Sequence, residues 1–246
     1  MVIENLTLHN FRNYEDETFA FDAGLNVLTG RNAQGKTNCA EAVFYLCTGT
    51  SLRIRHDRQL IRRGETSARI AAKAHTRFGS VTLEAVIFEN KRELFVNGNK
   101  VTKAADFVGN MNCVFFSPGE LRLIQDGPDE RRRFLNLSIS QTSREYCTAL
   151  ARYQRILDQR NNLLKERDVS LVLETLPVWD EQLSVYAARI VRHRRRYLSE
   201  LSPLAHDAHA YLTDGAEDLR LDMDGSYPED ETEIAEKLSR QFAAAR

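Results

Sequence analysis

Residues 25–37 contain glycine, lysine and threonine side chains at the spacing of a phosphate-binding loop. Their sequence, Leu-Asn-Val-Leu-Thr-Gly-Arg-Asn-Ala-Gln-Gly-Lys-Thr, ends in Gly-x4-Gly-Lys-Thr. Gly30 and Gly35 let the backbone turn tightly and approach a phosphate without an intervening Cβ. Lys36 would reach the β- and γ-phosphates of a nucleoside triphosphate, and the Thr37 hydroxyl would ligate Mg²⁺. The spacing therefore predicts a nucleoside triphosphate site.

The backbone of this loop is expected to do most of the binding. Its N–H groups and the positive end of the helix that follows would face the polyphosphate. Thr37 is the one predicted metal-binding residue, and no catalytic residue is predicted. The predicted nucleotide-binding residues of the loop are Gly30, Arg31, Asn32, Ala33, Gln34, Gly35, Lys36 and Thr37.

The elements around the loop follow from hydrophobic patterning. Alternation predicts strands at residues 2–8 and 16–21, and an apolar run predicts a third strand at 25–29, just before the loop. A helix is expected from about Lys36 to Cys47. Its predicted apolar face consists of Ala40, Val43, Phe44 and Cys47.

Further strands and turns are predicted downstream. Residues 68–75 and 80–88 have strand patterns, and 92–101 form a hairpin around Asn97-Gly98. Residues 113–116 predict a short buried strand. Ser117-Pro118 marks a helix start, and a second helix follows Asp126-Gly-Pro.

The pattern changes from about residue 142, where apolar residues at three/four spacing predict two long helices. A link at 168–176 would make them an antiparallel hairpin. Pro177 suits the start of the second helix, and Pro203 should kink or end it. The last thirty or so residues are acidic and show no period. The predicted division is a first lobe at 1–125 and a helical arm domain at 126–246.

Composition excludes several classes of protein. The chain is 42% hydrophobic and 28% charged, which fits a folded protein, and its formal net charge of −1 gives no global basic field. The four scattered cysteines form no C-x-x-C motif, which suits a reducing compartment. His206 and His209 are a weak metal motif. No signal peptide or membrane span is expected.

A series of motifs resembles the RecF family of SMC/ABC-type ATPases, in the right order along essentially the whole chain. The first two are the opening Leu6–Tyr14 and the segment Gly24–Asn38, which contains the loop. The others are Val96–Gly98, Phe115–Pro118, Pro128–Leu135, Tyr153 with Gln159–Asn161, and Val178–Gln182.

The resemblance implies an α/β P-loop NTPase of ABC/SMC type with an inserted antiparallel helical arm. It also implies a cytoplasmic, ATP- and Mg²⁺-dependent protein of recombinational repair and the SOS response. Such a protein binds gapped DNA, single-strand/double-strand junctions and single-stranded DNA, forms an ATP-dependent homodimer, and helps load RecA with RecO and RecR. Arg12 would lie near the nucleotide phosphates.

Two motifs needed for hydrolysis are absent. Val178-Trp-Asp180-Glu181 has too few preceding apolar residues for a Walker B strand, and Leu137–Gln141 lacks the glycines of an ABC signature loop. In the resembled family both motifs follow the arm, so the sequence favours a fragment. A catalytically dead nucleotide- or DNA-binding module stays a possible alternative. A nucleotide kinase is disfavoured because no acceptor pocket or Walker B acid is found.

Arginines form three groups that could contact DNA phosphates, at 53–63, 131–133 and 189–196. A solvated helix face explains the last group about as well. Within the sequence, aromatic and basic residues do not alternate in the way that single-strand binding by base stacking uses.

Overall fold

The computed structural model describes residues 1–51, 53–54, 56–223 and 225–244, without the side chains of Glu120 and Arg122. The chain divides into two compact units, Met1–Arg144 and Glu145–Arg246. The division between residues 125 and 126 that the sequence suggests stays a prediction.

An antiparallel sheet forms the frame of the first unit, with strand order β2-β1-β3-β4-β5-β6. The strands confirm the predicted ones at 2–8, 16–21, 68–75 and 80–88 and the hairpin at 92–101. Their bounds are β1 Val2–Phe11, β2 Tyr14–Ala20, β3 Ser67–Thr76, β4 Gly79–Phe88, β5 Arg92–Val96 and β6 Asn99–Val101.

Alternation along the strands builds the core of this unit. On β4, Val81, Leu83, Ala85 and Ile87 are buried on one face, as their period of two predicts. The β5–β6 turn at Asn97-Gly98 has a positive φ at both residues, 50° and 77°, which matches the right-handed twist of the strands.

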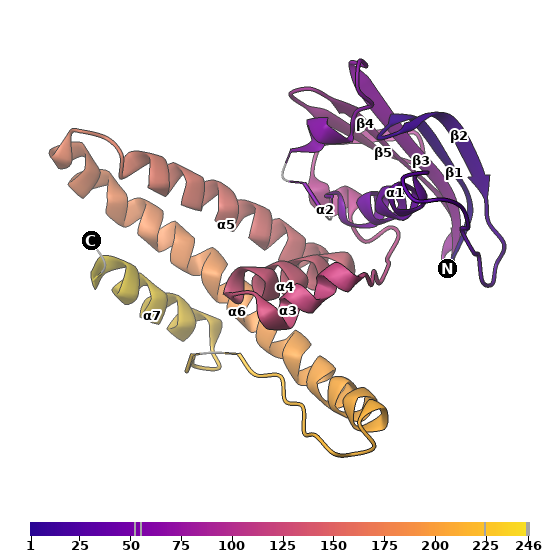
Figure 1. The fold of residues 1–246 in the computed structure, drawn as a ribbon. Coiled ribbons are helices and arrows are strands. Elements are labelled where there is room, and N and C mark those ends of the chain that lie inside the picture. Colours follow the sequence, from indigo (N-terminus) through magenta and orange to yellow (C-terminus); the bar gives the residue numbers. More distant parts are fainter. Residues whose placement is uncertain (52, 55, 224, 245–246) are drawn as a thin grey trace. The chain divides into compact units, whose positions relative to one another are not determined.

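Helix α1 (Lys36–Thr48) covers one face of this sheet (Figure 1). It confirms the predicted helix. The predicted apolar face is only partly right, because Phe44 and Cys47 are buried whereas Ala40 and Val43 are half-buried. The other buried apolar residues of the helix are Cys39, Ala42, Tyr45 and Leu46. The remaining helical segments of the unit are short, except the last: η1 Asp57–Leu60, α2 Ala104–Phe107, η2 Pro118–Leu121, α3 Arg122–Gln125 and α4 Pro128–Thr142.

Two predicted strands are wrong. Residues 25–29 and 113–116 form no strand, and Leu25 and Val114 are 89% and 101% exposed. A strand needs a neighbouring strand to take its backbone hydrogen bonds. Within the described residues neither segment has one, so their apolar sequence alone does not give strand structure.

The second unit contains a helical hairpin of α5 (Arg144–Leu163) and α6 (Val169–Leu212), which run antiparallel (Figure 1). Arg160 Nε lies 2.6 Å from Asp180 Oδ1, and Arg194 Nε lies 3.1 Å from the Tyr146 hydroxyl, which fixes the pairing of the helices. None of the helices in the described ranges is both long and apolar enough to cross a membrane.

The predicted start of the second helix is wrong, and Pro203 does not end that helix. α6 begins at Val169 because the Asp168 carboxylate accepts hydrogen bonds from the N–H groups of Ser170 and Leu171, at 3.0 and 3.2 Å. Pro177 and Pro203 lie inside the helix. Proline in a helix costs roughly 3 kcal/mol. Around Pro177, burial of side chains such as Leu176 and Leu183 offsets that cost.

The C-terminal segment is also more ordered than its acidic sequence predicts. Residues Glu231–Ala244 form α7, which packs on α6. Ile234 and Leu238 are buried in a small apolar cluster with Ala188 of α6. Their spacing of four puts both on one face, which is enough to dock a helix whose other faces are charged.

We expect Ile234→Ala to release α7. Truncating a fully buried isoleucine removes about 2–4 kcal/mol of packing, so the docked helix should open more often. Limited trypsin digestion should then cut at Lys237 and Arg240 at least tenfold faster than in the parent chain. Leu204→Ala, at a side chain that is 67% exposed, is the control and should leave the rate unchanged. Equal rates for Ile234→Ala and the parent would contradict the docking.

Candidate functional site

The predicted phosphate loop leaves the sheet after β2 and ends at α1. Gly30, Ala33 and Gly35 have φ values of +141°, +65° and +101°, so the loop turns through conformations that side chains rarely adopt. Lys36 Nζ donates hydrogen bonds to the carbonyl oxygens of Gly30 and Arg31, at 2.7 and 2.6 Å. The lysine head therefore lies over the loop, where a polyphosphate would be held.

Helix α1 starts at the end of the loop. The N–H groups of Asn38 and Cys39 donate to the Gly35 carbonyl at 2.7 and 2.9 Å. The backbone N–H groups from Asn32 to Thr37 make no hydrogen bond within the described part of the chain. These unpaired donors lie at the positive end of α1, which favours an anion there.

The chemistry of the loop fits a Mg²⁺-bound polyphosphate. Thr37 is exposed at the first turn of α1, so its hydroxyl is accessible to a metal ion. Burial raises the pKa of the Cys39 thiol to about 11. That thiol therefore stays neutral at physiological pH and puts no negative charge beside the loop.

Side chains of the opening motif, Leu6–Tyr14, pack against the phosphate loop and the start of α1. Asn38 Nδ2 donates to Asn13 Oδ1 at 2.7 Å. Tyr14 and Asn13 also lie so close to Gly35 that a Cβ there would be 2.6 Å from the Tyr14 hydroxyl oxygen and 2.8 Å from Asn13 Nδ2. The motif and the loop, about twenty residues apart in sequence, form one structure.

Gly35→Ala is expected to damage the site more than Gly30→Ala. Both positions have a positive φ, but the new methyl group at residue 35 would overlap Tyr14, whereas nothing lies within 4 Å at residue 30. We expect Gly35→Ala to lower the free energy of unfolding by about 2 kcal/mol or more, measured by thermal and urea denaturation. Gly24→Ala, with open space and no positive φ, is the control. Equal losses at residues 30 and 35 would contradict the close packing.

Arg12, predicted to lie near the nucleotide phosphates, forms an ion pair with a residue of α1. Its guanidinium forms a bidentate ion pair with Glu41 of α1, with Nε and Nη2 each 3.0 Å from a carboxylate oxygen. Arg12 Nη1 also donates to the Gln59 carbonyl at 3.1 Å. Contact between Arg12 and nucleotide phosphates stays a prediction.

Glu41 is the residue near this site that sequence reasoning missed. It is fully buried, and it also accepts a hydrogen bond of 2.7 Å from the Ser51 hydroxyl. The Ser51 carbonyl in turn accepts from Arg133 at 3.0 Å. The available signal was a lone acidic residue within the run of small and apolar residues from Cys39 to Cys47. A buried carboxylate there needs a cationic partner.

The two rejected motifs lie in unsuitable places for hydrolysis. Asp180 lies inside α6, is 1% exposed, and is bound to Arg160. Residues 137–141 are helical within α4, so they form no glycine loop. Neither can act as the element whose sequence it superficially matches.

The last of the three arginine groups, at 189–196, has partners within the second unit. In the last group, Arg189 and Arg192 pair with Glu231, Arg195 donates to the Pro228 carbonyl, and Arg194 contacts Tyr146. These arginines hold α5 and the segment that leads into α7 against α6. These contacts favour a structural role for the arginines of this group over contact with DNA phosphates. The histidines of the weak metal motif pair with carboxylates, His206 with Asp218 and His209 with Glu217.

Comparison with known proteins gives a consistent result. A family model described as an AAA domain matches residues 5–184. The DNA replication and repair proteins RecF of Geobacillus thermodenitrificans and Geobacillus kaustophilus are 39% and 40% identical over the whole chain. The chain spans 68% of each of these relatives, or about two thirds of their length.

Solved structures agree with the sequence comparison. A structure of the recombination mediator protein RecF with ATP, in the RecFOR pathway, is 28% identical and has a TM-score of 0.87. It matches 98% of this chain, and this chain covers 66% of it. A second such structure, of RecF with ATPrS, has a TM-score of 0.88 at 29% identity.

Proposed function

This chain belongs to the RecF family of P-loop ATPase-type proteins, and on that premise we propose that it is a nucleotide-controlled DNA-binding part of a recombination mediator. ATP would bind at Gly30–Thr37, with Lys36 on the β- and γ-phosphates. Thr37 would hold Mg²⁺, whose charge would neutralise the phosphate oxygens. The single observation that carries the proposal is the phosphate loop, with its unpaired N–H groups at the start of α1.

The DNA ligand and the partners are the finer part of the proposal. We propose binding to gapped duplexes, single-strand/double-strand junctions and single-stranded DNA in the cytoplasm, as part of the SOS response. The whole protein would act as an ATP-dependent homodimer with RecO and RecR, and it would promote loading of RecA. The names of the relatives support the DNA ligand and the RecO and RecR partners. Exposed arginines also support a DNA surface, namely Arg53, Arg58, Arg63, Arg131 and Arg132, while Arg55 lies outside the described residues.

Hydrolysis of ATP requires residues beyond those that bind ATP. None of the strands in the described ranges is followed by the Asp-Glu pair of a Walker B motif, which would hold Mg²⁺ and polarise the attacking water. We therefore propose that this stretch of the protein binds ATP, while hydrolysis depends on residues outside it. A nucleotide- and DNA-binding module without turnover is the second candidate, and it is favoured for this chain by the same observation.

Fluorescence anisotropy of a labelled gapped duplex tests the proposal. The chain is added with and without Mg-ATP at several salt concentrations. We expect binding that weakens as salt rises, because phosphate contacts release counterions, and that tightens with Mg-ATP. Salt-sensitive binding that ignores ATP would leave a DNA-binding module without a switch. Absence of DNA binding, with and without Mg-ATP, would refute the proposed function.

A further inference from the structure

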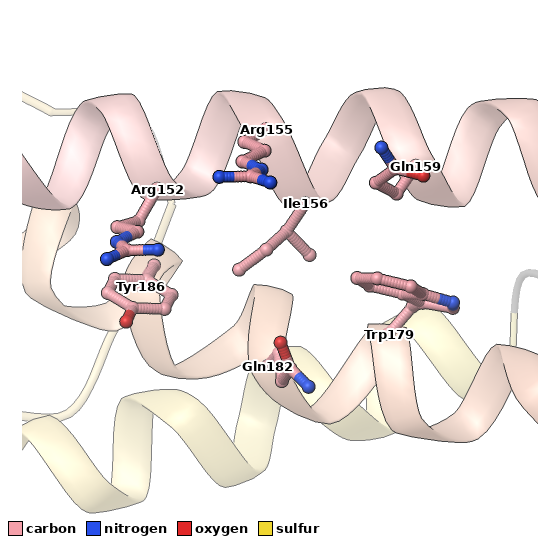
Figure 2. A pocket seen from close by; sticks show the side chains of 7 residues that line it. All are labelled: Arg152, Arg155, Ile156, Gln159, Trp179, Gln182 and Tyr186. Carbon is pink, nitrogen blue, oxygen red and sulfur yellow. The ribbon is translucent and has the colours of Figure 1, made fainter.

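A groove of about 190 Å³ lies between α5 and α6 of the second unit (Figure 2). Helix α5 lines it with Arg152, Arg155 and Gln159, and α6 lines it with Trp179, Gln182 and Tyr186. The groove is far from neutral, since its wall has two guanidinium groups and no carboxylate. It also contains the only tryptophan of the chain.

The positions of these side chains follow from helix geometry. On each helix the three residues are spaced i, i+3 and i+7, which places them in one stripe along the helix surface. Because the helices are antiparallel, Arg152 faces Tyr186 and Gln159 faces Trp179 (Figure 2). Ile156, which is 6% exposed, closes the floor between the two ends. With a rise of 1.5 Å per residue, the two aromatic rings are about 10 Å apart along α6.

The two groove arginines have no structural task that explains them. Arg160, the next basic residue of α5, forms the buried ion pair with Asp180 that joins the helices. Within the part of the chain that the structure describes, Arg152 and Arg155 form no ion pair and no hydrogen bond. Both side chains are exposed. Two unpaired guanidiniums in one groove repel each other, so an anionic ligand would stabilise the pair.

We propose that this groove binds a short segment of single-stranded nucleic acid. The guanidiniums of Arg152 and Arg155 would hold successive phosphates, and the rings of Trp179 and Tyr186 would stack on bases. The carboxamides of Gln159 and Gln182 would hydrogen-bond base edges. This inference rests on the proposed function, since it names one site at which the DNA of that proposal would be held.

The packing of the two helices makes the groove suitable for single-stranded nucleic acid, although the order of residues along the sequence does not indicate such a site. Basic and aromatic residues do not alternate along either helix. Antiparallel packing brings the basic stripe of α5 against the aromatic stripe of α6, which gives the combination of charge and stacking surface that single strands need. A nucleotide segment uses both components, whereas an acidic peptide would use only the arginines.

Trp179 makes the proposal directly measurable, because its emission reports on this groove alone. The full chain is titrated with the oligonucleotide (dT)8, which is also labelled for anisotropy. We expect binding to quench Trp179 emission and to protect it from iodide. Arg152→Gln with Arg155→Gln should weaken binding roughly tenfold or more and lower the salt slope by about 1.4, at about 0.7 per phosphate contact. Trp179→Ala should weaken binding by a similar factor, and Trp179→Phe by less.

The matched control removes the same charge elsewhere in the second unit. Arg167→Gln with Arg220→Gln changes two exposed arginines outside the groove and should leave both quenching and affinity near the parent values. Circular dichroism checks that each variant is folded. If a groove variant is misfolded, protection of Trp179 from iodide in the parent chain still decides.

The outcomes separate this inference from the proposed function. DNA binding seen by anisotropy without any change in Trp179 emission would overturn the groove site and leave the proposed function standing. Quenching by a poly-glutamate peptide but not by (dT)8 would overturn it in favour of an acidic protein partner. If the chain binds neither (dT)8 nor the gapped duplex, both proposals are overturned.

Discussion

Lys36→Ala is expected to lower the affinity for Mg-ATP at least about 100-fold. The Lys36 ammonium is held over the loop by the carbonyls of Gly30 and Arg31, and a bound triphosphate would replace those contacts with charged ones. Removal of one partner of such a charge pair costs about 3 kcal/mol or more, which corresponds to roughly a hundredfold in affinity. Titration with a fluorescent ATP analogue in the presence of Mg²⁺ measures the loss.

Lys100→Ala provides the matched control for this experiment. Lys100 is also a lysine of the first unit, but it lies on β6 and pairs with Glu93, with its side chain 53% exposed. We expect that variant to bind Mg-ATP like the parent chain. Retained affinity in Lys36→Ala, with the helix content unchanged, would refute the assignment of the phosphate loop as the nucleotide site.

Glu41→Ala is expected to destabilise the first unit by about 3–5 kcal/mol. The substitution leaves the Arg12 guanidinium, whose side chain is only 20% exposed, without its carboxylate partner. It also removes the acceptor of the buried Ser51 hydroxyl. An uncompensated charge in a buried place is among the costliest single changes. Urea denaturation followed by circular dichroism gives the free energy of unfolding.

A double variant distinguishes the ion pair from simple loss of packing. Because Arg12→Ala removes the unpaired charge, the Arg12→Ala/Glu41→Ala variant should lose less stability than the sum of the single variants. Glu17→Ala, at an exposed carboxylate of β2, should change stability by about 0.5 kcal/mol or less. Strict additivity, or a loss below about 1 kcal/mol for Glu41→Ala, would contradict a structural ion pair.

Features set by neighbouring residues were predictable from the sequence. The phosphate loop needs glycines at fixed positions, and Gly30 and Gly35 adopt the positive φ values that the motif implies. The Asn97-Gly98 hairpin and the alternation of β4 are local in the same way. The order of the motifs also indicated the family, which sequence comparison confirms.

Features that depend on distant partners were not predictable. Residues 25–29 and 113–116 have strand-like sequences, yet no described strand pairs with them. In the opposite direction, Pro177 and Pro203 did not break α6. Around Pro177 the helix is buried along one face, and such a helix tolerates a missing hydrogen bond. The acidic tail gave no obvious period, but two apolar residues were sufficient to dock α7 on α6.

The sequence by itself determined the phosphate-binding loop of this protein, because its conformation follows from the types and spacing of contiguous residues. Only the tertiary structure decided which side chains meet across elements. It paired Arg12 with the buried Glu41, and it placed Arg152 and Arg155 in one groove with Trp179 and Tyr186. The physical reason is that burial and side-chain pairing depend on packing between segments distant in sequence, whereas a turn of glycines depends on its own backbone.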